Sequence, residues 1–279
     1  MHRAHTSSQR PWIWPLAVML AASPGYPHSA LAQEGTFEPE IGQAGKDVVW
    51  VPTPEVLVEA MLDLAEVSPE DYVVDLGSGD GRNVIAAARR GARAQGVEYN
   101  PDMVDLSRRH ASESGVADRA RFVEGDMFAA DFSEADVLAL FLLPSNLLRL
   151  RAKFLDLRPG TRIVSNTFTI QDWAADETVT LEDDCTDWCV AYLYIVPAKV
   201  AGTWRLASGR LELTQQFQQV SGALTHESGS TDVTGSLRGA EITLTAGDQT
   251  FTGRVDGDTM AGSVRNGGRT ASWEATRQR

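Results

Sequence analysis

The sequence predicts an α/β fold, namely a Rossmann-like domain with a seven-stranded sheet followed by a small antiparallel all-β domain of the meander or barrel type. An apolar run, a glycine turn and a helical segment follow one another over residues 72–90, and acids end three successive predicted strands. Between Gly202 and Gly268, glycines separate short runs of alternating polarity. With 279 residues and 43% hydrophobic residues, the chain is long enough to form both parts.

The first segment, Tyr72–Leu76, is apolar except for Asp75 and reads as a buried strand. Glycines then occupy every second position over residues 77–81, and residues 83–90 read as a helix. Such a turn brings backbone close to a ligand beside the positive end of a helix. The spacing differs from the Gly-x-Gly-x-x-Gly of dinucleotide sites, and no Gly-Lys-Ser/Thr follows. Asp75 would repel a pyrophosphate but suits an ammonium group, which favours S-adenosylmethionine (SAM) as the ligand.

Two further acids extend this pattern. Glu98 ends the predicted strand 94–98, 17 positions after Gly81, close to the spacing of about 20 residues at which an acid meets ribose hydroxyls. Asp126 lies at the end of a third predicted strand, which begins at Arg121 and ends in Gly-Asp. The alternatives are a surface glutamate and an ordinary Gly-Asp turn. The joint occurrence of three acids at strand ends favours one shared pocket.

The remaining elements of the α/β domain follow from apolar periodicity. Thr53 is predicted to cap a first helix, with Pro54 at its first position and Val56 on its apolar face. Further helices are predicted over 102–112 and 145–155. The later strands are predicted over 135–144, 162–166, 178–183 and 190–196.

At Asp75–Arg82, the chain resembles the class I, seven-stranded SAM-dependent methyltransferases. Together with 51–54, 96–101 and 159–173, it resembles the branch of mitochondrial-type protein-lysine N-methyltransferases and their bacterial relatives, over about residues 48–197. The resemblance implies that the glycine loop holds the methionine part, Glu98 the ribose, and Asp126 with Met127 the adenine. The implied cofactor residues are Asp75, Gly77, Ser78, Gly79, Asp80, Gly81, Glu98, Tyr99, Asn100, Asp126 and Met127.

The acceptor side is expected where the fourth strand ends. Amide- and adenine-directed relatives carry Asn/Asp-Pro-Pro-Tyr there, whereas this chain has Leu142, Leu143, Pro144 and Ser145, which argues against nucleobase or glutamine acceptors. The extended segment Val51, Pro52, Thr53 either covers the sheet or closes over the ligand. No catalytic residue is assigned, because orientation and desolvation can suffice for methyl transfer to an amine. The acceptor, a protein or a small molecule, is not identified.

Composition argues against several other classes. The formal net charge of −13 and the lack of a Lys/Arg cluster argue against a nucleic-acid partner. No metal site is expected, because only His110 and His226 lie outside the presumed leader and only two cysteines are present. Two alternatives stay open: an exported, non-catalytic binding or scaffolding protein on the same fold, and an NAD(P)-dependent oxidoreductase, which the glycine spacing disfavours.

The N-terminus reads as a signal peptide over 1–32, cleaved after Ala32, with an uncleaved membrane anchor as the alternative. Cleavage would take the net charge from −13 to −15 and leave no membrane span. A linker is predicted over 33–47, the SAM-binding domain over 48–199 and the β domain over 200–279. The expected location is the periplasm or cell envelope. The expected location conflicts with the expected cofactor, because SAM is made in the cytoplasm.

Cys185 and Cys189 lie between the last two predicted strands of the α/β domain. In an exported protein they could form a disulfide, and reduced thiols are the alternative. The β domain carries no recognisable chemistry, so stabilisation of the enzyme is its expected role, with ligand or partner binding as alternatives. In that domain, Trp204 near the start and Trp273 near the end mark segments that could close a barrel. The oligomeric state is not predicted.

Overall fold

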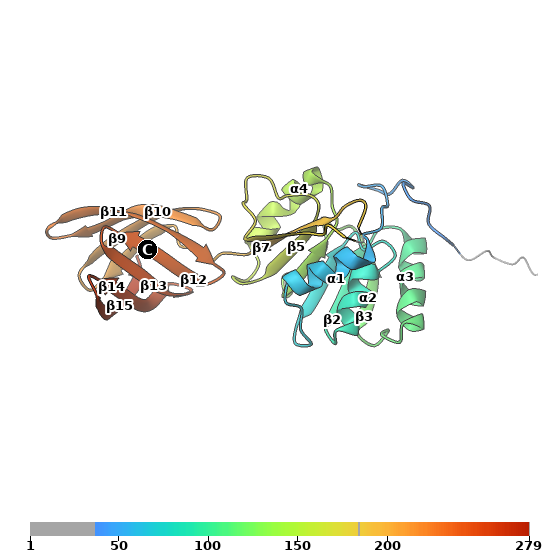
Figure 1. Ribbon diagram of the computed structural model, residues 1–279, viewed down its shortest axis with the longest axis horizontal. Coiled ribbons are helices and arrows are strands. Elements are labelled where there is room, and N and C mark those ends of the chain that lie inside the picture. Colours follow the sequence, from blue (N-terminus) through green and yellow to red (C-terminus); the bar gives the residue numbers. More distant parts are fainter. Residues whose placement is uncertain (1–36, 184, 279) are drawn as a thin grey trace, which may run out of the picture. The chain divides into compact units, whose positions relative to one another are not determined.

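The computed structural model describes residues 37–183 and 185–278 (Figure 1), and the predicted leader over 1–32 lies outside them. A seven-stranded sheet has the strand order β3-β2-β1-β4-β5-β7-β6. All neighbouring strands are parallel except those that pair with β7, which runs antiparallel to β5 and β6. The strands are β1 (Tyr72–Leu76), β2 (Arg93–Glu98), β3 (Ala120–Glu124), β4 (Val137–Leu140), β5 (Arg162–Asn166), β6 (Glu177–Thr180) and β7 (Val190–Ile195). The predicted seven-stranded α/β fold is therefore confirmed.

The central strands β1 and β4 are buried on both faces, as expected for parallel strands covered by helices. Alternate residues enter two apolar clusters. Val73 and Val137 pack with α1 (Glu55–Leu64), α2 (Arg82–Arg89) and α3 (Pro101–Glu113). On the other face, Val74 and Leu138 pack with α4 (Pro144–Leu155). The carboxyl ends of β1 and β2 are thereby held between two helical layers.

Several local predictions are wrong. The third strand ends at Glu124 before the Gly-Asp turn, and the sixth ends at Thr180 rather than at 183. The fourth strand ends at Leu140 rather than at 144, because α4 begins at Pro144 with Leu143 at its N-cap, so the chain has left the sheet by then. Thr53 does not cap α1; Pro54 holds the N-cap position without a side-chain hydrogen bond, and Val56 is exposed. The Thr53 hydroxyl instead accepts a hydrogen bond from Asn166 Nδ2, at 3.2 Å, across the end of the sheet.

The second part of the chain forms a closed antiparallel barrel. Buried residues alternate with exposed ones along its strands, and the buried set fills the interior with Trp204, Leu244 and Met260 among others. The barrel closes where β15 pairs with β8, so the predicted closure is confirmed. Its strands are β8 (Gly202–Leu206), β9 (Gly209–Gln216), β10 (Gln219–His226), β11 (Gly229–Arg238), β12 (Glu241–Ala246), β13 (Gln249–Asp256), β14 (Thr259–Asn266) and β15 (Arg269–Arg277).

The helices in the described part of the chain are short, and none of those within 37–183 and 185–278 is long and apolar enough to cross a bilayer.

Candidate functional site

A pocket opens at the carboxyl ends of β1 and β2, and most of the sequence-predicted site residues line it. On the cofactor side, Gly81 alone of the predicted residues is not in the lining. On the acceptor side, Val51, Pro52, Thr53, Leu142 and Leu143 line the pocket, whereas Pro144 and Ser145 do not. The predicted residues thus converge on one pocket even though they come from five separate segments of the chain.

The glycine turn after β1 is fixed by hydrogen bonds to the end of β2. The amides of Gly77 and Ser78 donate to the carbonyl oxygen of Val97, and the Gly79 amide donates to Glu98 Oε2 at 3.0 Å. Gly79 has φ +53°, and a Cβ atom there would lie 2.7 Å from Nε1 of Trp50. Only glycine fits this position, because a side chain would both strain the backbone and displace Trp50.

Among the acids of the pocket, Asp75 has the pKa that departs most from its ordinary value. Its side chain is buried, and its Oδ2 accepts a hydrogen bond from Asn83 Nδ2 at 3.0 Å. Burial is the main cause that raises the pKa of Asp75 to about 8; Glu98 and Asp80 raise it further, and the Asn83 hydrogen bond opposes them. A cationic group placed beside Asp75 would therefore favour its ionised form.

Asn83, which donates to Asp75, has a second buried polar atom, Oδ1, without a partner among the described residues. Buried polar atoms are normally paired, so Asn83 Oδ1 is a candidate for a ligand contact. An amide oxygen can accept from an ammonium group, and the methionine part of SAM carries such a group. Ser78 Oγ is also without a partner among the described residues, but it lies beside Gly96 and the buried Phe122 ring, so we do not assign it to the ligand.

Glu98 is held in place by two backbone amides. Its Oε2 accepts from Gly79, and its Oε1 accepts from the Asn100 amide at 2.9 Å. Asn100 in turn caps α3 by accepting from the Asp102 amide. An ionised carboxylate has about four acceptor positions, so Glu98 can still accept from two ribose hydroxyls.

Asp126 lies at the rim and pairs with a lysine from the N-terminal segment. Lys46 Nζ is 2.6 Å from Asp126 Oδ2 and 4.7 Å from the centre of the Tyr99 ring. The hydrogen bond from Lys46, followed by one from the Phe128 amide, lowers the pKa of Asp126. In the sequence, residues 43–47 belong to the predicted linker; in the structure they line this pocket, as part of the segment 43–50 that we call the strap.

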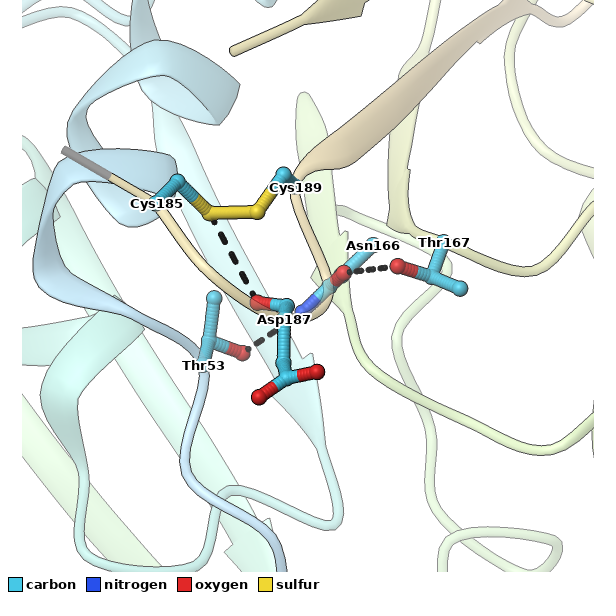
Figure 2. The surroundings of a disulfide bond; sticks show 6 residues. All are labelled: Thr53, Asn166, Thr167, Cys185, Asp187 and Cys189. Carbon is cyan, nitrogen blue, oxygen red and sulfur yellow. Dashed lines mark hydrogen bonds between the residues drawn. A yellow bond between two sulfur atoms is a disulfide. The ribbon is translucent and has the colours of Figure 1, made fainter. Parts of the chain in front are cut away.

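Several lining residues were missed by the sequence analysis. Asn83 could have been noticed as the one polar residue on the buried face of α2, directly after the glycine turn. By contrast, Phe141, Phe168 and Trp188 follow three different strands and carry no local signal. Trp188 lies within the loop closed by a disulfide between Cys185 and Cys189 (Figure 2), which resolves the alternative between a disulfide and free thiols.

The pocket combines a glycine loop that follows a buried acid with a second acid at the end of the next strand, and the sheet has the strand order given above. Together these features define a class I SAM-dependent methyltransferase. Comparisons with known proteins agree. A family model described as the ANTKMT methyltransferase domain matches residues 75–177. A protein-lysine N-methyltransferase of Saccharolobus islandicus is 41% identical over 152 residues, which are 53% of this chain and 94% of the relative. The chain therefore belongs to the protein-lysine N-methyltransferase family.

Two further matches are also methyltransferases. The adenine nucleotide translocase lysine N-methyltransferase of Mus musculus is 36% identical over 137 residues, which are 48% of this chain and 58% of the mouse protein. Among solved structures, an RNA methyltransferase of Salinibacter ruber in complex with S-adenosylhomocysteine is 49% identical, with a TM-score of 0.50, and the match covers 54% of this chain and 96% of that one. SAM is accordingly the methyl donor of this enzyme.

Proposed function

We propose that the enzyme methylates the side-chain amine of lysine in a protein, with SAM bound in the pocket at the ends of β1 and β2. In this proposal, Asp75 and Asn83 hold the ammonium of the methionine part. Glu98 binds the ribose hydroxyls, and Asp126 with Met127 binds the adenine. The observation that carries the binding mode is Asp75, a buried acid that is hydrogen-bonded to Asn83, whose own Oδ1 has no partner among the described residues.

SAM supplies an electrophilic methyl group, and transfer forms a nitrogen–carbon bond while the carbon–sulfur bond breaks and leaves its electron pair on sulfur. The chain's own part is to place and desolvate the amine. Leu142 is buried at the pocket wall, and Thr53 lines the same pocket. An apolar wall disfavours the charged form of the incoming amine and so promotes the loss of its proton, which passes to solvent. No dedicated base is required.

Lysine is favoured by the names of the relatives, since the Saccharolobus enzyme is a protein-lysine methyltransferase. RNA is the acceptor named for the Salinibacter structure. The net charge of −13 opposes binding to a phosphate backbone, which requires neutralisation by Lys and Arg. A protein acceptor is therefore the better-supported choice.

The test is methyl transfer from radiolabelled SAM to two acceptor pools, protein and RNA, both extracted from the source cells. We expect label in the protein pool, recovered as methyllysine after acid hydrolysis. Label confined to RNA would overturn the lysine assignment while keeping the enzyme class. No label in either pool, with SAM bound by calorimetry, would favour a binding or scaffolding role.

We further propose that the protein acts in the cell envelope. Its support is the leader-like sequence over 1–32 and the Cys185–Cys189 disulfide, since disulfides persist in oxidising compartments. Fractionation followed by N-terminal sequencing tests this. We expect a chain that begins at Gln33 in the envelope fraction, and a full-length chain in the cytoplasm would contradict the proposal.

A further inference from the structure

Three aromatic rings gather at the acceptor side of the pocket. Phe141 follows β4, Phe168 follows β5, and Trp188 lies between β6 and β7. The ring centres of Phe141 and Phe168 are 6.1 Å apart, and Trp188 lies 5.6 Å from the first and 5.9 Å from the second. These distances are those of packed aromatic pairs, so the rings form one cluster, which we call the aromatic triad.

The aromatic triad is not part of the buried core. All three rings line the pocket, Phe141 and Phe168 are half-buried, and Trp188 is 39% exposed. Large apolar side chains are usually buried, and an exposed apolar patch inside a pocket indicates a place for a ligand. The triad adjoins Leu142 and Thr53, which line the same pocket.

Backbone contacts tie the loops of Phe168 and Trp188 together. The amide of Thr167 donates to the carbonyl oxygen of Val190, the residue directly after Cys189. Ser165 Oγ donates to the Phe168 carbonyl at 2.8 Å. The side chain of Asn166 donates to Thr53 and accepts from Thr167 (Figure 2). The end of β5 is thus linked by hydrogen bonds both to the acceptor side of the pocket and to the disulfide loop.

The disulfide closes a short loop around Trp188. Cys185 and Cys189 are four positions apart, and Figure 2 shows their disulfide together with Asp187 of the loop. By sequence, the closed loop also contains Thr186 and Trp188. Trp188 has φ +62°, a left-handed conformation that costs a bulky residue free energy. Without a constraint, the loop would relax toward conformations that move the ring. The covalent link therefore restricts the loop and holds the tryptophan against the two phenylalanines.

We propose that Phe141, Phe168 and Trp188 form the binding site for the acceptor lysine, and that the Cys185–Cys189 disulfide positions Trp188 in it. This assignment rests on the proposed function. A lysine side chain is an alkyl stem that ends in an amine, and aromatic faces pack against such a stem. The rings exclude water from the amine, and their faces stabilise the positive charge that arrives on nitrogen as the methyl group is transferred.

The first experiment varies the tryptophan. Poly-L-lysine is the acceptor probe, poly-L-arginine is its control, and transfer is followed as methyllysine. Trp188→Ala should lower kcat/KM for poly-L-lysine about tenfold, mainly through KM. Trp188→Phe should restore most of the loss because it keeps an aromatic face, whereas Trp188→Leu should not. Thr186→Ala, in the same loop, is the matched control and should leave kcat/KM unchanged.

The second experiment tests the disulfide. Dithiothreitol should raise the KM of the wild type for poly-L-lysine, and the double variant Cys185→Ser, Cys189→Ser should show the raised KM with and without the reductant. The Kd for SAM, measured by calorimetry, should change less than about threefold in every variant, because the triad lies on the acceptor side.

The outcomes separate the two proposals. Transfer to poly-L-lysine with equal kcat/KM in wild type and Trp188→Ala would overturn the acceptor site and keep the proposed function. An equal loss in Trp188→Ala and in Trp188→Phe would overturn the role of the aromatic face. Absence of transfer by the wild type to poly-L-lysine and to the cellular protein pool would overturn both.

Discussion

The two sides of the pocket are formed by different chemical groups on different kinds of element. The cofactor side consists of backbone amides and carboxylates at the ends of neighbouring parallel strands, such as the Gly79 amide bound to Glu98. The acceptor side consists of rings from separate loops, and one of them, Trp188, depends on a disulfide loop. The first arrangement is fixed by the sheet, whereas the second can change with the loops and leave the sheet intact.

This difference has a functional consequence. A cofactor common to many enzymes needs the same contacts each time, and strand ends supply them with little freedom. The acceptor differs from enzyme to enzyme, and loops on a rigid scaffold can be altered to suit it. Variants on the cofactor side should therefore affect SAM binding, and variants of the triad should affect the acceptor alone.

The largest effect is expected from Asp75→Asn. The amide can still accept the hydrogen bond from Asn83 but no longer carries the charge that pairs with an ammonium group. Loss of one charge-assisted hydrogen bond costs about 1.5–3 kcal/mol, so the Kd for SAM should rise roughly 10- to 100-fold. Calorimetry measures the Kd, and a melting temperature without SAM that is not below that of the wild type is the control for folding. An unchanged Kd would remove Asp75 from the site.

A second prediction compares alanine substitutions at two glycines, each of which has a left-handed backbone conformation. Gly81 has φ +84°, and a Cβ there would lie 2.7 Å from Cζ of Phe122; Gly115 has φ +69° and open space around it. Gly115→Ala should cost about 1 kcal/mol through backbone strain alone. Gly81→Ala should cost a further 1–3 kcal/mol, because the methyl group overpacks the turn against Phe122. Urea denaturation measures both, and equal losses would contradict a tightly packed turn.

The sequence predicts the cofactor side well because its residues follow from strand periodicity. Asp75 and Glu98 lie at the carboxyl ends of predicted strands, and parallel strands place such ends at one edge of the sheet. The same logic cannot find Phe141, Phe168 or Trp188, which come together through tertiary packing. The strap was also missed, because its polar sequence looks like a linker, and its place over the pocket depends on contacts such as Lys46 with Asp126.

The antiparallel architecture of the barrel was predictable from the sequence, whereas the pairing of its residues was less so. Alternating polarity and glycine turns identify antiparallel strands, and the filled interior follows from that alternation. The register was not predictable. The closing ladder pairs Trp204 with Arg277 rather than with a residue near Trp273, because the twist and length of the strands decide which residues meet.

The third prediction concerns pH. Because the pKa of Asp75 is raised to about 8, well above the 3.8 of an ordinary aspartate, the carboxyl holds a proton in the folded protein over much of the range where the unfolded chain has lost it. Folding stability contributed by this group is therefore full below about pH 4 and declines as the pH rises toward 8. A bound ammonium would weaken this trend by lowering the pKa of Asp75.

SAM binding should accordingly release a proton, and SAM affinity should rise with pH between about 5.5 and 7.5, by at most tenfold per unit. The α-ammonium of SAM stays largely charged up to about pH 7 and is still mostly charged at the upper end of this range. Calorimetry in buffers of different ionisation enthalpy measures the released proton. The Asp75→Asn variant is the control and should show a flat profile. A flat profile in the wild type would contradict the contact between Asp75 and the ammonium.

The smallest effect is expected from Lys46→Met in the strap. Lys46 and Asp126 are each about one-third exposed, and ion pairs at such positions are weak because water screens them. If Asp126 binds the adenine amino group, Lys46 competes with that contact and also repels the cationic ligand. Its removal should therefore tighten SAM binding by up to about threefold, and the gain should shrink at high salt.

Lys199→Met, which removes an exposed ion pair with Asp156, is the matched control and should leave the Kd for SAM unchanged. A tenfold weakening in Lys46→Met would instead mean that the strap holds the cofactor through this lysine.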